Sequence, residues 1–140
     1  ADRAEVLANA ARVYQWLGEQ TTRPQILVAA PMGSLGDALP VLAATPVEAI
    51  GIDLLRGSVP VGAQLTGKVI AAGVVDGHNI WRTDLDVALA TLKAVEALGA
   101  TVAVSTSTSL FHVPHTLKGE EHLGAELISW LAFADEKVSV

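Results

Sequence analysis

The chain has 140 residues, of which 51% are hydrophobic, and it carries a net charge of -6 and no cysteine. This length is enough for one domain with a core of its own, and the negative charge argues against nucleic acid or an anionic membrane surface as a partner. The lack of cysteine excludes disulfides, a thiolate nucleophile and Cys-ligated metal sites, and without a long apolar span or a signal segment we expect a cytoplasmic protein.

Short apolar runs alternate with segments in which apolar residues recur at three- and four-residue spacing, so we expect strands alternating with helices. The expected strands cover residues 25–30, 47–55, 68–75 and 101–104. The expected helices cover residues 2–18, 35–42, 84–98 and about 123–134. Thr83 is expected to cap the third helix, whereas the connector over 56–67, with three glycines and Pro60, is expected not to be helical.

Each long helix has a predicted buried stripe. The stripe of the first helix is Val6, Leu7, Ala10, Val13, Tyr14 and Leu17. The stripe of the third helix is Leu85, Ala88, Leu89, Leu92 and Val95. The shared face of the last helix is Leu123, Leu127, Trp130, Leu131 and Ala134.

This order predicts an α/β fold of about four parallel βα units with right-handed crossovers. Such an order fits half of a (βα)8 TIM-type barrel, and it also fits a small doubly wound sheet. The sequence has no Gly-x-Gly-x-x-Gly and no Walker-type loop, which weakens the nucleotide-binding version of the second fold.

Polar residues follow the predicted strands at the edge where parallel strands end. The candidate site residues are Asp53, Asp76, Asn79, Arg82 and Ser105. They could converge on a ligand, but strand-end carboxylates more often accept hydrogen bonds within turns. We therefore favour the interpretation in which Asp76, Asn79 and Arg82 pair with one another and with loop amides, and we assign no catalytic residue.

The four histidines are poorly spaced for a metal site. His112 and His115 are separated by Pro114, so they do not share a helical face, and we expect no metal in this chain. A Ser105–His112–Asp76 triad is conceivable, but no Gly-x-Ser-x-Gly turn supports it.

Several motifs along nearly the whole chain resemble one family. They are Met32-Gly33-Ser34, Ile52-Asp53-Leu54 with Arg56-Gly57, Ala72-Gly73-Val74-Val75-Asp76-Gly77-His78-Asn79-Ile80-Trp81-Arg82, Ser105-Thr106-Ser107-Thr108-Ser109-Leu110-Phe111-His112-Val113-Pro114, and Glu126-Leu127-Ile128-Ser129-Trp130-Leu131-Ala132-Phe133-Ala134. The chain thereby resembles the N-terminal barrel of the cobalamin-independent methionine synthases, with the segment around Asn79 and Arg82 as the most specific match.

The resemblance implies a piece of a methyltransferase in methionine biosynthesis that passes a methyl group from 5-methyltetrahydropteroyltriglutamate to homocysteine. In that family two (βα)8 barrels lie face to face, and the zinc with its ligands belongs to the C-terminal barrel. Residues 1–140 would then be one unit, a partial N-terminal barrel that serves as scaffold, holds no cofactor and is inactive alone. The alternative is an independent α/β ligand-binding module that uses Asp53, Asp76, Asn79 and Arg82.

A half-barrel has two open edges, so we expect a protein partner. This partner is either the remainder of the parent chain or another copy of the same chain. The residues expected to face the barrel interior without an opposing layer are Val28, Ile52, Val74 and Val102.

Overall fold

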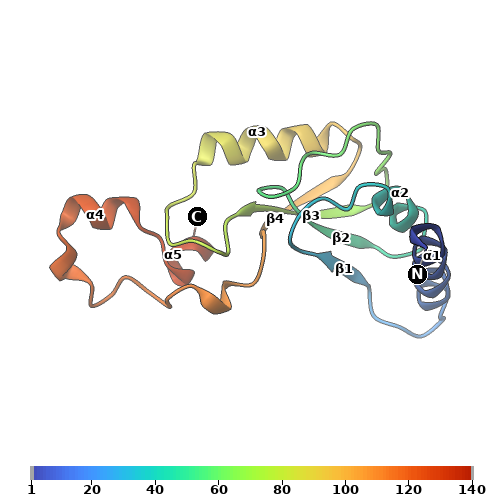
Figure 1. The fold of residues 1–140 in the computed structure, drawn as a ribbon, viewed down its shortest axis with the longest axis horizontal. Coiled ribbons are helices and arrows are strands. Elements are labelled where there is room, and N and C mark those ends of the chain that lie inside the picture. The colour runs from blue at the N-terminus through green and yellow to red at the C-terminus, as the bar shows by residue number, and fades with distance from the viewer. Residues whose placement is uncertain (1, 140) are drawn as a thin grey trace.

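The computed structural model describes residues 2–139, and its centre is one sheet of four parallel strands in the order β1-β2-β3-β4 (Figure 1). The strands are β1 (Leu27–Ala30), β2 (Ala49–Asp53), β3 (Val69–Val75) and β4 (Thr101–Thr106). Each strand therefore neighbours the next one in the sequence, as in part of a (βα)8 barrel. The predicted α/β class and the four parallel strands are confirmed, although each strand differs from its predicted bounds by one or two residues at one end or both.

Helices and short 3-10 turns connect and flank the strands. They are α1 (Arg3–Gly18), α2 (Ala38–Ala43), α3 (Leu85–Glu96), η1 (Leu110–His112), η2 (Glu121–Leu123), α4 (Ala125–Trp130) and α5 (Ala134–Val138). Asp2 caps α1 as predicted, with its side chain accepting from the backbone N–H of Ala4. Among residues 2–139 no helix is both long and apolar enough to cross a membrane.

The cap of α3 differs from the prediction. Asp84, not Thr83, is the N-cap, because its carboxylate accepts hydrogen bonds from the backbone N–H groups of Asp86 and Val87, both at 3.1 Å. The Thr83 hydroxyl is buried and has no hydrogen-bond partner among the described residues. Either residue type can cap a helix, and the helix start was placed one residue too early.

The core lies between the sheet and the helical layer, on the face to which even-numbered strand residues point. The largest fully buried apolar side chains are Ile50, Leu65, Ile70, Val47 and Val95. Val28 and Ile52 belong to the same core, and Val102 packs against it. The prediction that Val28, Ile52, Val74 and Val102 face the barrel interior was therefore wrong, because the alternation of each strand was assigned to the opposite face.

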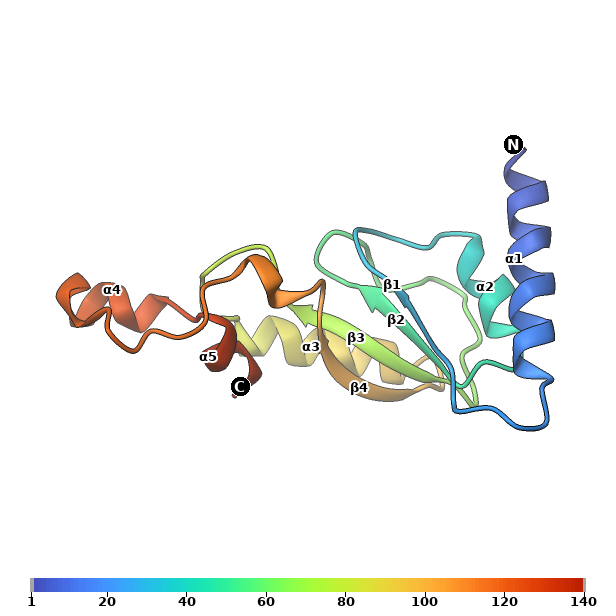
Figure 2. The same ribbon diagram turned by 90° about the horizontal axis from the view of Figure 1, so that it is seen from below.

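The opposite face of the sheet is the inner surface of the half-barrel. It carries mainly small residues, since Ala29, Gly51, Ala71 and Ala103 occupy matching register positions on the four strands. Leu27 at the start of β1 is 53% exposed on this side. Within the described chain no second layer covers this surface, which is what half of a barrel leaves open (Figure 2).

The connector between β2 and β3 forms no helix, as predicted. It still closes the core, because Leu65 is fully buried and Val59 and Ala63 pack against the core cluster. Glycine 67, with a φ of 80°, supplies a left-handed turn just before β3.

The predicted last helix is broken into separate pieces. The chain from 115 to 131 extends away from the sheet as an arm that includes α4 (Figures 1 and 2), and Leu131 pairs with Trp81 in an isolated antiparallel bridge. The N–H of Arg82 donates to the Trp130 carbonyl at 2.8 Å, and the N–H of Ala132 donates to the Ile80 carbonyl at 2.8 Å. These backbone bonds hold 131–133 in an extended conformation, so a continuous helix cannot form.

The predicted helix stripes are only partly buried. No residue in the described helix α1 is fully buried, and in α3 Val95 alone is. Leu85 and Leu89 of the predicted α3 stripe are 58% and 49% exposed. The side of α3 that is buried or half-buried carries Ala88, Thr91, Leu92 and Val95, so the prediction that Leu85 and Leu89 belong to the buried stripe was wrong.

Candidate functional site

The strand ends meet at one edge of the sheet, called the rim here. In the parallel register Asp53 lies beside Gly73, which lies beside Ser105. The loops that follow β2, β3 and β4 therefore leave the sheet side by side. This is where parallel α/β sheets place their binding groups.

Asp53 is the most buried of the predicted site residues, with 1% of its surface exposed. One carboxylate oxygen accepts from the N–H groups of Leu55 (2.9 Å) and Arg56 (3.0 Å), and the other accepts from that of Gly33 (3.1 Å). Burial by itself raises the pKa of Asp53, but the three N–H donors and the nearby Arg56 charge outweigh it and lower the pKa. The carboxylate ties the loops after β1 and β2 together.

Asp76 organises the loop after β3. Its Oδ1 accepts from the backbone N–H of His78 at 2.7 Å, and its Oδ2 accepts from Nδ2 of Asn79 at 2.8 Å. Oδ1 of Asn79 in turn accepts from the N–H of Trp81 at 3.1 Å. These bonds are the turn chemistry that the favoured interpretation predicted for Asp76 and Asn79.

Arg82 does not join this cluster, which corrects the predicted pairing with Asp76. Its guanidinium donates instead to the backbone carbonyls of Ser129 (3.1 Å) and Leu131 (3.3 Å). The residue lies beyond the turn and faces the C-terminal arm, which the sequence separation of nearly fifty residues concealed. Arg82 therefore holds the arm to the loop after β3.

Lys137 of α5 is a buried residue that the sequence reasoning missed. Its ammonium group donates to Oδ1 of Asn79 (3.2 Å) and to the carbonyl of Trp81 (2.9 Å), and only 3% of the residue is exposed. Burial lowers the pKa of Lys137, while the Asp76 charge acts in the opposite direction. No local pattern around Lys137 marks it as buried, because its partners are about 55 residues earlier in the chain.

His78 joins the loops after β2, β3 and β4 through a single ring nitrogen. Nη1 of Arg56 lies 3.0 Å from Nδ1, and the Thr108 hydroxyl lies 2.9 Å from the same atom. Arginine can only donate, so Nδ1 is the acceptor in this contact. A hydroxyl–imidazole–carboxylate relay needs its two partners on opposite ring nitrogens, yet Thr108 and Asp76 both face Nδ1.

Ser105 lies on the inner surface just inside the rim. It lines a cavity of about 270 Å³ together with Ala71, Gly51 and the hydroxyl residues that follow β4. Its hydroxyl donates to the Thr106 carbonyl at 3.2 Å. The Ser/Thr run after β4 thus faces the barrel interior, and Ser107 alone in it is buried, accepting from the N–H of Gly77 at 3.3 Å.

Two glycines at the rim allow very close backbone packing. A Cβ added to Gly77 would lie 2.5 Å from the Thr108 carbonyl oxygen, and one added to Gly73 would lie 2.7 Å from the Ile52 carbonyl oxygen. Both positions are therefore closed to any larger residue without a shift of the neighbouring backbone. This packing brings the loop that carries His78 against the loop that carries Thr108.

The rim is thus a closed network of charges and amides rather than an open catalytic constellation. Among the described residues, the rim has one ion pair between an arginine and a carboxylate. In it, Nη1 of Arg56 lies 3.9 Å from Oδ1 of Asp76. Across residues 2–139 no three His, Cys, Asp or Glu side chains lie close enough to hold a metal ion. The geometry can anchor loops and the C-terminal arm, and its one hydroxyl–imidazole pair among the described residues, Thr108 with His78, has no carboxylate on the opposite ring nitrogen.

Comparison with known proteins gives two results. The family model described as "Cobalamin-independent synthase, N-terminal domain" matches residues 1–100. Three relatives share the printed name 5-methyltetrahydropteroyltriglutamate--homocysteine methyltransferase. The protein of Rhodococcus jostii (strain RHA1) is 53% identical over 99% of this chain, that of Mycobacterium tuberculosis (strain ATCC 25618 / H37Rv) is 54% identical over 96%, and that of Mycobacterium leprae (strain TN) is 50% identical over 97%.

The chain matches only part of the length of each relative. The chain covers 19% of the Rhodococcus protein and 18% of each of the two mycobacterial proteins. It therefore spans about a fifth of the length of the curated relatives that it matches.

Proposed function

Since the chain belongs to the family of cobalamin-independent synthase N-terminal domains, we propose that it is a scaffold segment of a methyltransferase that transfers a methyl group from 5-methyltetrahydropteroyltriglutamate to homocysteine. The observation that carries this proposal is the identity of 53% over nearly the whole chain to a protein with that printed name. At this level of identity the fold and the local role of a segment are shared. The cytoplasmic location expected from the sequence is part of the same proposal.

The segment contributes structure to this function and no reacting group. The side chains of Asp53 and Asp76 accept hydrogen bonds from loop amides, and Asn79 donates to Asp76. This supports a scaffold role over the ligand-binding module that the sequence also allowed, because a ligand would have to displace these bonds.

The zinc that the resemblance implies for the parent enzyme does not fit this part of it. The sequence has no cysteine, and among the described residues no group of three potential ligands lies together. We place the metal and the chemistry that it supports in the remainder of the parent enzyme, and we derive no catalytic step from the residues present here.

A chimera tests the proposal. The 140 residues replace the matching segment of the Rhodococcus jostii enzyme, and methionine formation from homocysteine and 5-methyltetrahydropteroyltriglutamate is measured. We expect the chimera to retain the transfer at a rate within about tenfold of the parent, because preserved packing of the segment avoids the misplacement of about 1 Å that could cost about a hundredfold in rate. A chimera that folds with the parent's melting temperature but transfers no methyl group would contradict the proposal.

A matched control sharpens the result. A second chimera carries Gly77→Ala, which pushes a methyl group against Thr108 at the rim. If the segment is a scaffold, this variant loses stability and activity together. Loss of activity at unchanged stability would instead indicate that the rim contacts substrate.

A further inference from the structure

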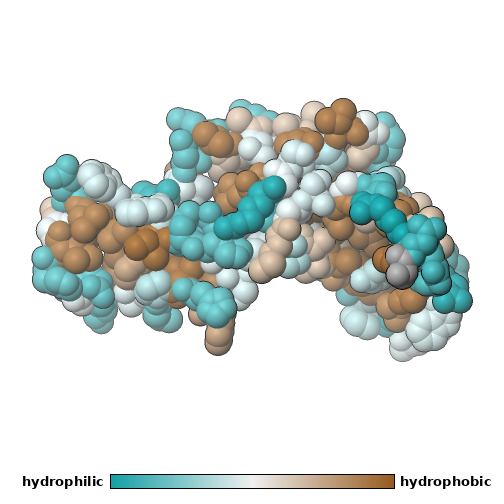
Figure 3. Space-filling view, in the orientation of Figure 1, coloured by the Kyte–Doolittle hydropathy of each residue, from teal (hydrophilic) through white to brown (hydrophobic). Residues whose placement is uncertain are grey.

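The three loops that leave the rim side by side are joined by the side chain of His78. Nη1 of Arg56, from the loop after β2, lies 3.0 Å from its Nδ1, and the Thr108 hydroxyl, from the loop after β4, lies 2.9 Å from the same atom. All three residues belong to connections that follow neighbouring strands of the sheet, so the contacts are made within the described chain. Figure 3 shows hydrophilic side chains on the surface between the sheet and the C-terminal arm, where these loops emerge.

Arg56 is the polar link between the loops after β2 and β3. Its guanidinium makes both polar side-chain contacts that the described residues show between these loops, one with His78 and one, at 3.9 Å, with Oδ1 of Asp76. The shorter contact is a hydrogen bond, and it exists only while Nδ1 of His78 has a free electron pair. The contact between the two loops therefore depends on the protonation state of one imidazole.

Protonation of His78 reverses the role of its Nδ1. Histidine is the side chain whose charge changes most readily between pH 5 and 8. The added hydrogen makes Nδ1 a donor and places two positive groups at hydrogen-bond distance, so the bond from Arg56 is lost. The proton can reach the ring from solvent without unfolding, because 36% of the His78 side chain is exposed.

The groups around the imidazole decide which side chain moves. Oδ1 of Asp76 lies 4.0 Å from Nδ1 of His78 and 3.9 Å from Nη1 of Arg56, and the charge of Lys137 from α5 also acts on this carboxylate. His78 is held by its backbone N–H, which donates to Asp76 at 2.7 Å, and the Thr108 hydroxyl can turn to accept from the protonated ring. The Arg56 side chain is 44% exposed and makes no other hydrogen bond among the described residues. The imidazole therefore stays in place, and the guanidinium moves away.

We propose that His78 is a proton-operated switch that holds Arg56 near neutral pH and releases it in acid. The release removes the side-chain hydrogen bond between the loops after β2 and β3, and it places a free guanidinium at the rim. The loops after β3 and β4 stay joined, because Thr108 keeps its contact with the imidazole. This inference does not depend on the proposed methyltransferase function.

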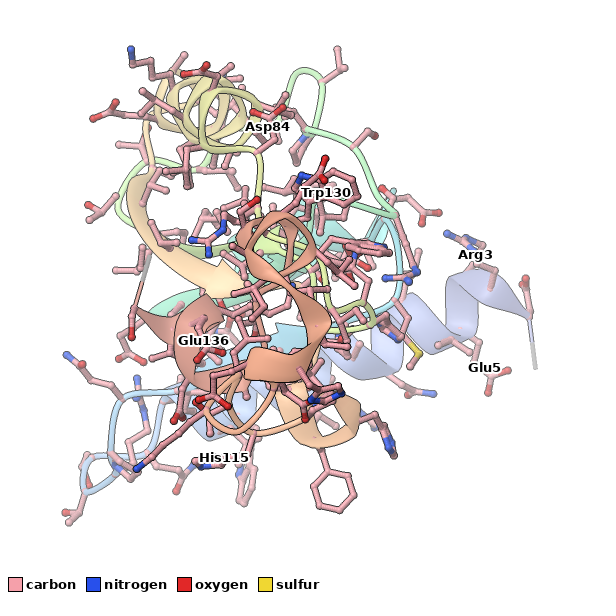
Figure 4. All side chains as sticks on the ribbon, turned by 90° about the vertical axis from the view of Figure 1, so that its left-hand side faces the viewer. Arg3, Glu5, Asp84, His115, Trp130 and Glu136 are labelled. Atoms are coloured by element: carbon pink, nitrogen blue, oxygen red, sulfur yellow. The ribbon has the colours of Figure 1, made fainter. Side chains whose placement is uncertain are left out.

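NMR of the 140-residue chain with ¹⁵N-labelled histidine and arginine follows both side chains between pH 8 and pH 5. We expect Nδ1 of His78 to be unprotonated at pH 8, and the Nε–Hε signal of Arg56 to move at the pH at which His78 takes up its proton. His78→Gln should abolish this movement, because the titrating group is gone. His115→Gln is the matched control and should preserve it. His115 (Figure 4) also faces a carboxylate, with its Nδ1 3.5 Å from Asp135, but among the described residues it contacts no arginine.

The reciprocal substitution distinguishes a coupled switch from two independent titrations. In Arg56→Gln the side chain keeps a donor but loses its charge. His78 should then take up its proton at a pH higher by roughly half to one unit, which is the effect of a unit charge about 4 Å away in water. Lys93→Gln, at an exposed position on α3, should leave this midpoint unchanged. An Arg56 signal that stays constant while His78 is protonated would overturn the proposal, and so would an unchanged His78 midpoint in Arg56→Gln.

Discussion

The ammonium nitrogen of Lys137 lies 3.2 Å from Oδ1 of Asn79, and this contact joins the last helix of the chain to the loop after β3. The same nitrogen donates to the Trp81 carbonyl, and Asn79 is itself held by Asp76. A charge from α5, which follows the arm, thus completes a turn that begins at the rim. Helix α5 and the rim are joined by this contact, although 58 positions separate the two residues.

Lys137→Met should loosen the arm. Methionine keeps the length of the side chain but leaves the Trp81 carbonyl and Oδ1 of Asn79 without the Lys137 donor, so we expect a loss of about 1–3 kcal/mol of unfolding free energy. Urea unfolding measures this loss, and hydrogen exchange at the amides of Arg82 and Ala132 should accelerate with it. Lys93→Met, at an exposed position on α3, is the control and should change neither quantity.

Asp76→Asn should destabilise the chain by about 1–3 kcal/mol. An amide in place of the carboxylate can accept from the His78 N–H or from Asn79, but not well from both, and it leaves Lys137 without its nearby negative charge. Chemical denaturation beside the control Glu96→Gln measures the effect. A variant as stable as the natural chain would show that the turn does not depend on the carboxylate.

The ion pair of Glu48 makes the free energy of unfolding depend on pH in the acid range. Arg23 donates to both of its carboxylate oxygens (2.9 and 3.1 Å), and with the Ile26 N–H this lowers the pKa of Glu48 from 4.5 to about 2. A carboxyl with a depressed pKa in the folded state stabilises the fold above its unfolded pKa, and this contribution disappears as the pH falls through the folded pKa. We expect Glu48→Gln to be less stable than the natural chain at pH 6, with the difference shrinking between about pH 4.5 and pH 2.

The measurement for Glu48 is the unfolding free energy at a series of pH values for both proteins. Glu5→Gln on the exposed part of α1 is the matched control, and its curve should run parallel to that of the natural chain. A difference between Glu48→Gln and the natural chain that stays constant down to pH 2 would contradict the assignment of the ion pair.

Gly77→Ala should cost about 1–3 kcal/mol of stability by overpacking. The added methyl group would lie 2.5 Å from a backbone oxygen of Thr108, which cannot move without displacing the loop after β4. Gly51→Ala is the control, since its added Cβ would meet neighbours at ordinary contact distances of 3.5 Å and more. Thermal unfolding of both variants should therefore separate them clearly, and equal melting temperatures would contradict the close approach.

The isolated chain should bind no zinc and form no methionine. It lacks cysteine, and among residues 2–139 no cluster of potential ligands is present. Metal analysis after dialysis and an assay with homocysteine and 5-methyltetrahydropteroyltriglutamate check both expectations. Stoichiometric zinc that is lost in His112→Ala would refute the first, and methyl transfer free of contaminating full-length enzyme would refute the second.

The sequence by itself determined the order of the elements. The alternation of apolar runs with helical spacing predicted four parallel strands, and glycines and Pro60 predicted a connector without a helix. These features depend on local periodicity and on backbone preferences, which each segment carries alone. The hydrogen bonds of Asp76 within its turn could also be predicted from the sequence, because their partners lie within three residues.

Tertiary structure alone decided which face of each strand is buried and which partners the distant polar groups find. Val28 and Ile52 face the helices because the helical layer lies on that side, and a period of two cannot tell one face from the other. Arg82 reaches the carbonyls of Ser129 and Leu131, and Lys137 reaches Asn79, only after the arm folds back against the loop after β3. That same docking holds 131–133 extended through backbone bonds to Ile80 and Arg82, which overrides the helical spacing of the last segment.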